Sequence, residues 1–426
     1  MNLLKEVLRR EVFPALGCTE PIAVALAASA AAAEIKGSLG EIAIIVDPGV
    51  YKNGLAVAVP NTGGEKGNLI AGVLGALIQR PDLAMEVLGG VRPGMIKRAI
   101  EIIRSGKAAI TYDPERTDLY IEVLVKTEKG NARSVVENGH TNLTLVEKNG
   151  AVVFQKAGAG GKSEPPAYKT ALRDCSVPDL IDLVEAMDAE DYKAVRRGVE
   201  MNLKAAESGR GLKKVGHYVS RLVEKGLLLN DVVSSSKVLA GSATDARMAG
   251  LSVPVMSSGG SGNQGIVAIL VPYNVGRYFK VEEQRLLQSI ALSHLTNGYI
   301  KCFTGDLSPL CGCAISAGVG AAVAVVYQLK GRDLDGITLA VNSLISDLGG
   351  MLCDGAKAGC ALKVVSSTDS AIRAAYMALN GHGIRETEGF VGATAEETIR
   401  NFSRIGRIGM AGVDAAMLEI MKAKMV

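Results

Sequence analysis

The spacing of hydrophobic residues changes character along the chain. Residues 1–12 and the apolar run 21–33 follow the period of an α-helix. Between residues 42 and 155, apolar and polar positions alternate in β-branched runs separated by Lys-Gly and Asn-Gly turns, which is typical of an antiparallel sheet. Two helical patterns, 67–79 and 92–104, lie between these runs. The segment is therefore predicted to be an α+β unit.

Within this unit, the stretch EIAIIVDPGVYKNGLAVAVP (41–60) carries two β-branched runs around turn residues, so two strands are predicted there. From residue 177 to the C-terminus the helical period dominates and is broken by glycine-rich joints. The Gly-rich and Pro-Pro stretch 157–169 is the best candidate for a linker.

The predicted fold class is α+β, with a small antiparallel-sheet α+β domain joined to a larger, mostly α-helical domain. The first predicted domain is 1–165, with an N-terminal helix that carries Cys18 and a sheet over about 40–156. The second is 166–426 and is expected to be all helical.

Composition and charge narrow the class of protein. A chain of 426 residues can bury sizeable cores without disulfides. Its 47 basic and 44 acidic residues are interspersed, which gives no electrostatic footprint for nucleic acid or an anionic membrane. The longest uncharged apolar runs, 21–33 and 314–329, are shorter than the roughly 18 to 20 residues of a membrane span. With no signal-peptide pattern at the N-terminus, we expect a cytoplasmic protein that binds neither nucleic acid nor membrane.

Seven cysteines in a cytoplasmic protein favour metal binding or catalysis over disulfides. Cys18, in GCTEP, immediately precedes a predicted helix. The positive end of the helix dipole would lower the pKa of a thiol there and make a thiolate available as base or nucleophile. The alternative is a small buried hydrophobic residue that happens to precede a helix. The residues alone leave both open.

The motif SPLCGC offers Ser308 as N-cap and Pro309 as first helical residue, so Cys311 and Cys313 are predicted to lie in the first turns of a helix. Two positions apart on a helix, their side chains would point about 200° away from one another. Only one of them could then face a given centre. In an extended loop, the pair could instead chelate one metal.

Cys353 and Cys360 stand seven positions apart. On a continuous helix they would be about 10.5 Å apart, which is far for two ligands of a compact cluster, but Gly355 and Gly359 permit a turn that brings the sulfurs together. Several thiols beside only four histidines favour thiolate-only ligation, as in an iron–sulfur cluster or a zinc site. Two further cysteines lack such a context and are interpreted as structural: Cys175 and Cys302.

The segment SSGGSGNQG ends just before a helical pattern, so its backbone N–H groups could bind a carboxylate, although a plain sharp turn would suit the same residues. The side-chain donors of Ser257, Ser258 and Asn263 favour substrate binding. His140 follows an Asn-Gly turn and is either a solvated turn residue or a further substrate contact.

Taken together, GCTEPIAVALA, SSGGSGNQG, LCGC and CDGAKAGC resemble, across nearly the whole chain, the L-cysteine desulfidase family, which is related to the iron–sulfur L-serine dehydratases of the alpha-chain type. The resemblance implies a [4Fe-4S] cluster held by three cysteines with one iron open to substrate. It also implies elimination of the β-substituent of an amino acid without pyridoxal phosphate. The helical domain would be the catalytic, cluster-binding one.

Carried over by motif, the resemblance implies Cys18 as base and Cys353 and Cys360 as ligands. The related dehydratases separate their first two ligands by 42 positions, which fits Cys311 and not Cys313, since Cys313 lies 40 positions before Cys353. Cys313 is then expected to be a packing residue. The dehydratases place their third ligand farther along than this chain does, so the comparison is imperfect.

The expected reaction converts L-cysteine to sulfide, pyruvate and ammonia, with SSGGSGNQG and His140 positioning the carboxylate and the amine. A second candidate is L-serine or L-threonine dehydration at the same site. A candidate of another class is a thiol-rich redox or metal-sensing protein without turnover. The expected partner is a small-molecule amino acid, and a homodimer is left open.

Overall fold

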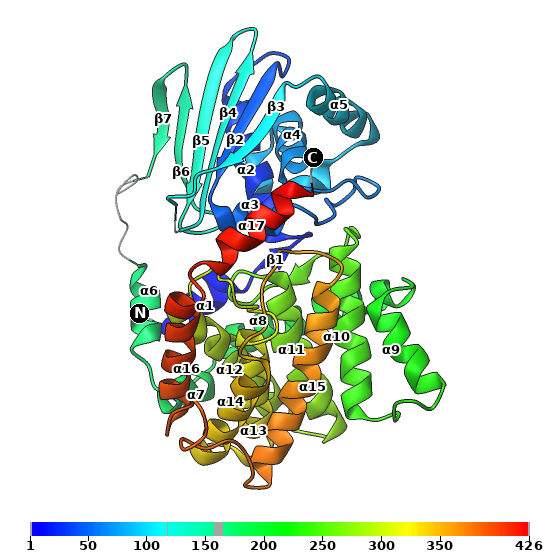
Figure 1. The fold of residues 1–426 in the computed structure, drawn as a ribbon, viewed down its shortest axis with the longest axis vertical. Helices are drawn as coiled ribbons and strands as arrows, with labels where there is room; N and C mark the ends of the chain where they lie inside the picture. The colour runs from blue at the N-terminus through cyan, green and yellow to red at the C-terminus, as the bar shows by residue number, and fades with distance from the viewer. Residues whose placement is uncertain (1, 117, 157–164, 425–426) are drawn as a thin grey trace.

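The computed structural model describes residues 2–116, 118–156 and 165–424 and shows two units stacked along the long axis of the molecule (Figure 1). One unit is a sheet with helices on one face, and the other is a group of packed helices. The predicted α+β fold class is thus confirmed. Most of the predicted linker, 157–164, lies outside the described residues. None of the described helices is long and apolar enough to cross a membrane.

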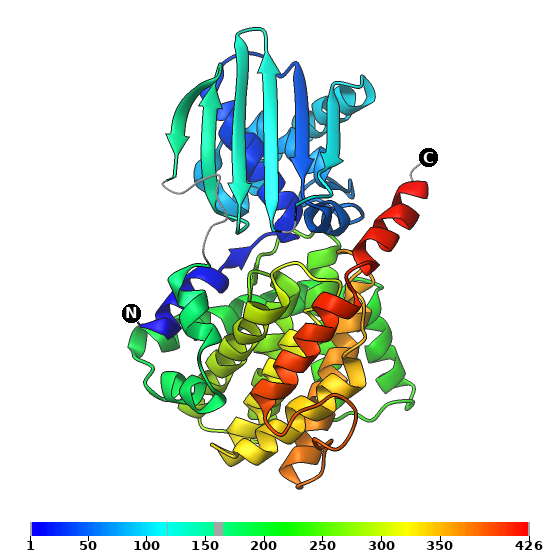
Figure 2. The same ribbon diagram turned by 60° about the vertical axis from the view of Figure 1, so that its left-hand side comes forward.

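The sheet has the strand order β3-β2-β4-β5-β6-β7 and can be followed in Figure 2. Its strands are β2 (Glu41–Val46), β3 (Ala108–Tyr112), β4 (Tyr120–Thr127), β5 (Gly130–Glu137), β6 (Leu143–Lys148) and β7 (Ala151–Gln155). All neighbours are antiparallel except β2 and β3, which run parallel. The long connection between β2 and β3 allows this, because parallel neighbours need a crossover. The sheet is therefore mixed, where the sequence predicted an antiparallel one.

Helices cover one face of the sheet (Figure 1). They are α2 (Thr19–Glu34), α3 (Pro48–Gly54), α4 (Asn68–Ile78), the 3₁₀ segment η1 (Pro81–Gly90) and α5 (Pro93–Arg104). The patterns at 21–33, 67–79 and 92–104 are confirmed as α2, α4 and α5. Helices α2 and α4 pack closely because Gly75 has no side chain: a Cβ there would lie 2.1 Å from the Ala25 carbonyl oxygen.

The prediction of a second strand within 41–60 is wrong: the turn residues after β2 form α3, and the second β-branched run contributes only an isolated bridge between Ala58 and Lys66. Asp47 caps this helix by accepting hydrogen bonds from the Gly49 and Val50 amides, and Pro48 occupies the first turn. Cap and proline together start a helix in the stretch that the sequence predicted to be a turn. Helix α3 reaches the boundary between the units, where its last residues face the candidate site.

The second unit is almost entirely helical, as predicted from residue 177 onward. Its helices are α6 (Ala167–Arg173), α7 (Val177–Glu185), α8 (Ala189–Arg210), α9 (Val215–Glu224), α10 (Val232–Met248), α11 (Gly262–Tyr278), α12 (Glu283–Thr304), α13 (Ser316–Lys330), α14 (Leu334–Leu348), α15 (Cys360–Leu379) and α16 (Ala395–Arg404), followed by the π-helical turn η2 (Ile405–Gly409). Helices α11, α12 and α13 form its centre, and α13 is buried along almost its whole length.

Both ends of the chain cross between the units. Helix α1 (Leu3–Glu11) packs into the core of the helical unit through Leu4 and Val7, and the short strand β1 (Pro14–Ala15) pairs with β8 (Val255–Met256) of that unit. Helix α17 (Val413–Ala423) returns to the α/β unit, where Leu418 is buried. The chain therefore exchanges elements across the predicted 165/166 boundary.

Candidate functional site

A cavity of about 80 Å³ lies where the two units meet, which is room for several water molecules. Five of the seven cysteines line it: Cys18, Cys311, Cys313, Cys353 and Cys360. The α/β unit also contributes Glu20, Asn53 and His140 to the wall. Residues far apart in sequence thus meet in one place.

Cys18 stands at the N-cap of α2 and is 4% exposed. Its thiol donates a hydrogen bond to Glu20 Oε2 across 2.8 Å. Burial, reinforced by the negative charge of Glu20, raises the pKa of this thiol well above its usual range. The predicted helix start is confirmed, but the predicted lowering of the pKa is wrong for the protein alone. Desolvation and a neighbouring carboxylate outweigh the helix dipole.

Glu20 is a buried carboxylate that the sequence analysis missed, although it lies two residues after Cys18. Its Oε1 accepts a hydrogen bond from Asn53 Nδ2 at 3.2 Å and lies 3.8 Å from His140 Nε2. Burial opposes its ionisation, but His140 and the Cys18 thiol hold the pKa of the carboxyl well below its usual range. With a side chain that is 10% exposed at the cavity wall, His140 is not a solvated turn residue.

The loop that carries Cys311 and Cys313 is not helical. The prediction of a helix from Pro309 is wrong, because α13 begins only at Ser316. Hydrogen bonds to a distant loop hold this backbone instead: the Cys311 amide donates to the Met351 carbonyl at 2.9 Å, and Leu310 pairs with Leu352 in a short antiparallel bridge. Such pairing competes with a helical first turn.

The two thiols of this loop therefore do not point apart. The adjacent Cys313 thiol lowers the pKa of Cys311 to about 7, against the effect of burial. The pKa of Cys313 is raised well above its usual range by Cys311 and by burial. The thiols of Cys353 and Cys360 also act on Cys313. The geometric argument that only one of the pair can face the centre does not apply.

The loop with Cys353 is folded back, as the sequence predicted from its glycines. Gly355 has a φ of +89°, and a Cβ there would lie 2.4 Å from the Lys52 carbonyl oxygen. The Cys353 amide donates to the Pro309 carbonyl at 2.6 Å, and Cys360 is the first residue of α15. Burial raises the pKa of Cys353 to about 11 and that of Cys360 as well. Both are neutral thiols in the protein alone.

The four thiols of the helical unit form a donor set composed of sulfur only. Among the described residues, no three His, Cys, Asp or Glu side chains form a ready-made site for a single metal ion. An iron–sulfur cluster is larger than one ion and takes thiolate ligands. Lys363 lies beside Cys311 and opposes protonation of its thiol. The donor chemistry therefore fits a thiolate-bound cluster.

The residues predicted from SSGGSGNQG separate into two groups. Asn263 lines the cavity, but Ser257 and Ser258 do not and are fully buried. Ser257 Oγ donates to the Glu11 carbonyl at 2.9 Å and accepts from the Phe13 amide. Ser258 Oγ has two protein partners, His294 Nδ1 at 2.8 Å and Asn297 Nδ2 at 3.0 Å. The structure does not bring these two hydroxyls to the cavity.

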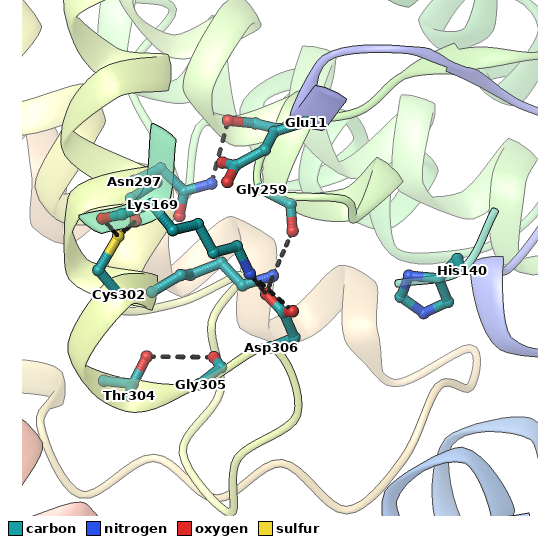
Figure 3. A network of polar contacts seen from close by, with 12 residues as sticks. Glu11, His140, Lys169, Gly259, Asn297, Cys302, Thr304, Gly305 and Asp306 are labelled. Carbon is teal, nitrogen blue, oxygen red and sulfur yellow. Dashed lines mark hydrogen bonds and ion pairs between the residues drawn. The ribbon is translucent and has the colours of Figure 1, made fainter. Parts of the chain in front are cut away.

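A partly buried ionic network, which the sequence analysis missed, contacts this glycine turn (Figure 3). Lys301 donates to the Gly259 carbonyl and lies 3.4 Å from Asp306, which also pairs with Lys169 at 2.9 Å. Against the effect of burial, the two lysines hold the pKa of Asp306 well below its usual range. Figure 3 shows His140 approaching from the other side. The network fixes the turn that leads into α11.

Comparison with known proteins shows which family this chain resembles. The serine dehydratase alpha chain family matches residues 116–419. UPF0597 proteins of Geobacter sulfurreducens and Elusimicrobium minutum are 60% and 54% identical over 424 residues, covering 100% of this chain and 99% and 100% of theirs. A UPF0597 protein of Desulfatibacillum aliphaticivorans is 38% identical over 432 residues, covering 99% of this chain and 98% of its own. No solved structure matches the chain.

The matched region contains His140, the SSGGSGNQG turn and the four thiols of the helical unit, while Cys18 and Glu20 precede it. The thiol-lined cavity is thus built largely from the part that the family shares. The chain belongs to the serine dehydratase alpha chain family, a family of iron–sulfur-dependent lyases.

Proposed function

We propose that the protein is a [4Fe-4S]-dependent L-cysteine desulfidase, which eliminates sulfide from L-cysteine and yields pyruvate and ammonia. The observation that carries this proposal is the meeting of Cys18, from the α/β unit, with the thiols of the helical unit around one buried cavity. A base and a cluster-binding donor set are the two parts that such an elimination needs.

Cys311, Cys353 and Cys360 are the proposed ligands, which leaves one iron open. When bound, such a cluster supplies a Lewis acid for the leaving sulfur. The 42-position spacing favours Cys311 over Cys313. Since both thiols of LCGC line the cavity, that spacing alone now supports the choice.

Cys18 is the proposed base for the α-proton. Its thiol must first lose its own proton, which burial and the Glu20 charge oppose in the protein alone. Removal of the α-proton breaks the Cα–H bond, and its electron pair forms the Cα=Cβ bond as the Cβ–S bond breaks. Sulfide leaves with the electron pair of the Cβ–S bond, and aminoacrylate tautomerises and reacts with water to give pyruvate and ammonia.

Asn263 and His140 reach the cavity and are the proposed substrate contacts. Ser257 and Ser258 do not contact the substrate in this proposal. Their hydrogen bonds hold the turn before α11 in place. Their role in substrate binding is therefore positional.

L-Serine or L-threonine dehydration is the second candidate, and the family match favours it. It uses the same base and cluster with a hydroxyl as leaving group. Anaerobic assays of the iron-loaded protein separate the two: a desulfidase has a kcat/KM for L-cysteine well above that for L-serine. The reverse order would replace the proposal with dehydration.

A further inference from the structure

One charged side chain at the cavity has no partner. Arg247, near the end of α10, lines the cavity and is only 2% exposed. Among the described residues it makes no side-chain hydrogen bond or ion pair, and its buried Nε and Nη2 atoms have no acceptor. An arginine cannot lose its charge in a protein. A buried cation without a counter-charge is strongly unfavourable.

The other charged groups of the cavity wall are already paired with one another or with nearby residues. Lys363 donates to Asp354, Lys301 lies beside Asp306, and Glu20 is held by its neighbours at the wall. In the part of the chain that the structure describes, none of them is placed to neutralise Arg247. The Arg247 charge acts on the Cys18 thiol, but burial and Glu20 keep that thiol protonated in the protein alone. The missing counter-charge therefore comes from a molecule that enters the cavity.

The position of Arg247 indicates that this molecule has a negatively charged group. A Cβ at Gly262 would lie 2.4 Å from Arg247 Nε and 2.8 Å from its Cζ, so the guanidinium rests against the first residue of α11. Helix α11 spans 17 residues, and its N-cap Ser261 makes no side-chain cap. Within the described chain, the amides of Gly262, Asn263 and Gln264 donate to no backbone carbonyl. A helix N-terminus carries a partial positive charge, so two positive groups lie side by side at the cavity wall, where one anion in the cavity can contact both.

We propose that Arg247 and the first turn of α11 bind the α-carboxylate of the amino-acid substrate. This inference rests on the proposed function for the identity of the substrate. A guanidinium matches a carboxylate in a bidentate geometry. The buried carbonyl oxygens of Asn263 and Gln264 accept no hydrogen bond among the described residues and complement the α-ammonium group. The ligand class is α-amino acids with a free carboxylate, and amides and decarboxylated amines are excluded.

Calorimetric binding of L-alanine to the anaerobically reconstituted protein tests this site without turnover, because L-alanine has no leaving group. L-Alanine binds and L-alaninamide does not. Arg247→Met weakens L-alanine binding by about 10- to 100-fold, which is the range for loss of a hydrogen bond to a charged group, and Arg247→Lys restores part of it. Arg277→Met, an exposed position on α11, is the matched control and binds normally.

A purely structural arginine would give a different result. Since Arg247 is unpaired in the ligand-free protein, Arg247→Met keeps or raises the ligand-free Tm and loses only the Tm shift caused by L-alanine. A lower ligand-free Tm, equal binding of acid and amide, unchanged affinity in Arg247→Met, or no binding of L-alanine to the unaltered protein would each overturn the inference. Arg247-dependent binding in a protein that consumes no amino acid would contradict the proposed function and leave the carboxylate site standing.

Discussion

The thiol of Cys18 donates a hydrogen bond to the carboxylate of Glu20 across 2.8 Å, and both groups are buried at the junction of the two units. Burial and the Glu20 charge keep the thiol protonated in the protein alone. The proposed base is therefore protonated beside an ionised carboxylate, and it packs in the same buried cluster as Cys360 of the helical unit.

Replacement of Cys18 tests its role. Cys18→Ala is expected to retain iron and to lose activity by about 10²- to 10⁴-fold, the usual contribution of a positioned general base. Iron content and pyruvate formation are measured on the same anaerobic sample. Cys302→Ala is a matched control, since that thiol bonds to the Gly298 carbonyl within α12 and does not line the cavity. Loss of iron in Cys18→Ala would show that Cys18 is a ligand.

The two cysteines of LCGC are expected to differ. Cys311→Ser should abolish cluster binding, because it removes a proposed ligand, and Cys313→Ser should largely spare it. Iron and sulfide content after anaerobic reconstitution, together with the visible absorption of the cluster, measure this. The opposite pattern would assign the ligand to Cys313, whose thiol also faces those of Cys353 and Cys360.

His294 is expected to make the fold sensitive to acid. Burial lowers the pKa of His294 to about 3, against an ordinary value near 6.5, so the unfolded chain binds this proton first as the pH falls. Its contribution to stability is full above pH 6.5 and is lost as the pH falls toward 3. The free energy of unfolding should drop by about 1.4 kcal/mol per pH unit within this window.

Urea unfolding between pH 6.5 and 5, above the range in which most carboxylates titrate, isolates the histidine. His294→Gln removes the ionisable ring and should flatten the dependence of stability on pH there. An equally steep dependence in the variant would show that other groups are responsible.

Close packing between α2 and α4 is expected to tolerate no side chain at Gly75. Gly75→Ala places a Cβ 2.1 Å from the Ala25 carbonyl oxygen and should destabilise the fold by about 1 to 3 kcal/mol. Gly94→Ala is the control, because a Cβ there meets no atom within 4 Å, and it should be neutral or stabilising by up to about 1 kcal/mol. Denaturant midpoints compare the two. Equal stability of both variants would contradict the packing described.

Local patterns predicted the elements whose signals lie within one segment. The helix start after Cys18 and the turn at Gly355 follow from caps and glycines, and both are confirmed. The helix expected from Pro309 fails because the Cys311 amide bonds to the Met351 carbonyl, a partner 40 residues away that no local pattern reveals. Likewise, the turn expected after β2 becomes α3 because Asp47 caps a helix there, and the β-branched run that follows α3 pairs only at Ala58.

The candidate site was predicted only in part, because local patterns do not reveal which distant residues meet. Cysteine and glycine motifs identified the thiols that line the cavity. The charged groups beside them were missed: Glu20 lies within GCTEP and Arg247 lies in no motif, and the importance of both follows only from burial and from the groups they face. The thiol pKa of Cys18 has the opposite direction to the expected one because desolvation cannot be read from a helix start.

The measurement that tests the central claim most directly is the stoichiometry of products from L-cysteine. Protein purified without oxygen and loaded with iron and sulfide is mixed with L-cysteine, and sulfide and pyruvate are measured together. We predict equal amounts of the two, with catalytic turnover. An iron-loaded protein that releases neither product from L-cysteine, and no pyruvate from L-serine, would contradict β-elimination and would indicate a binding or sensing role.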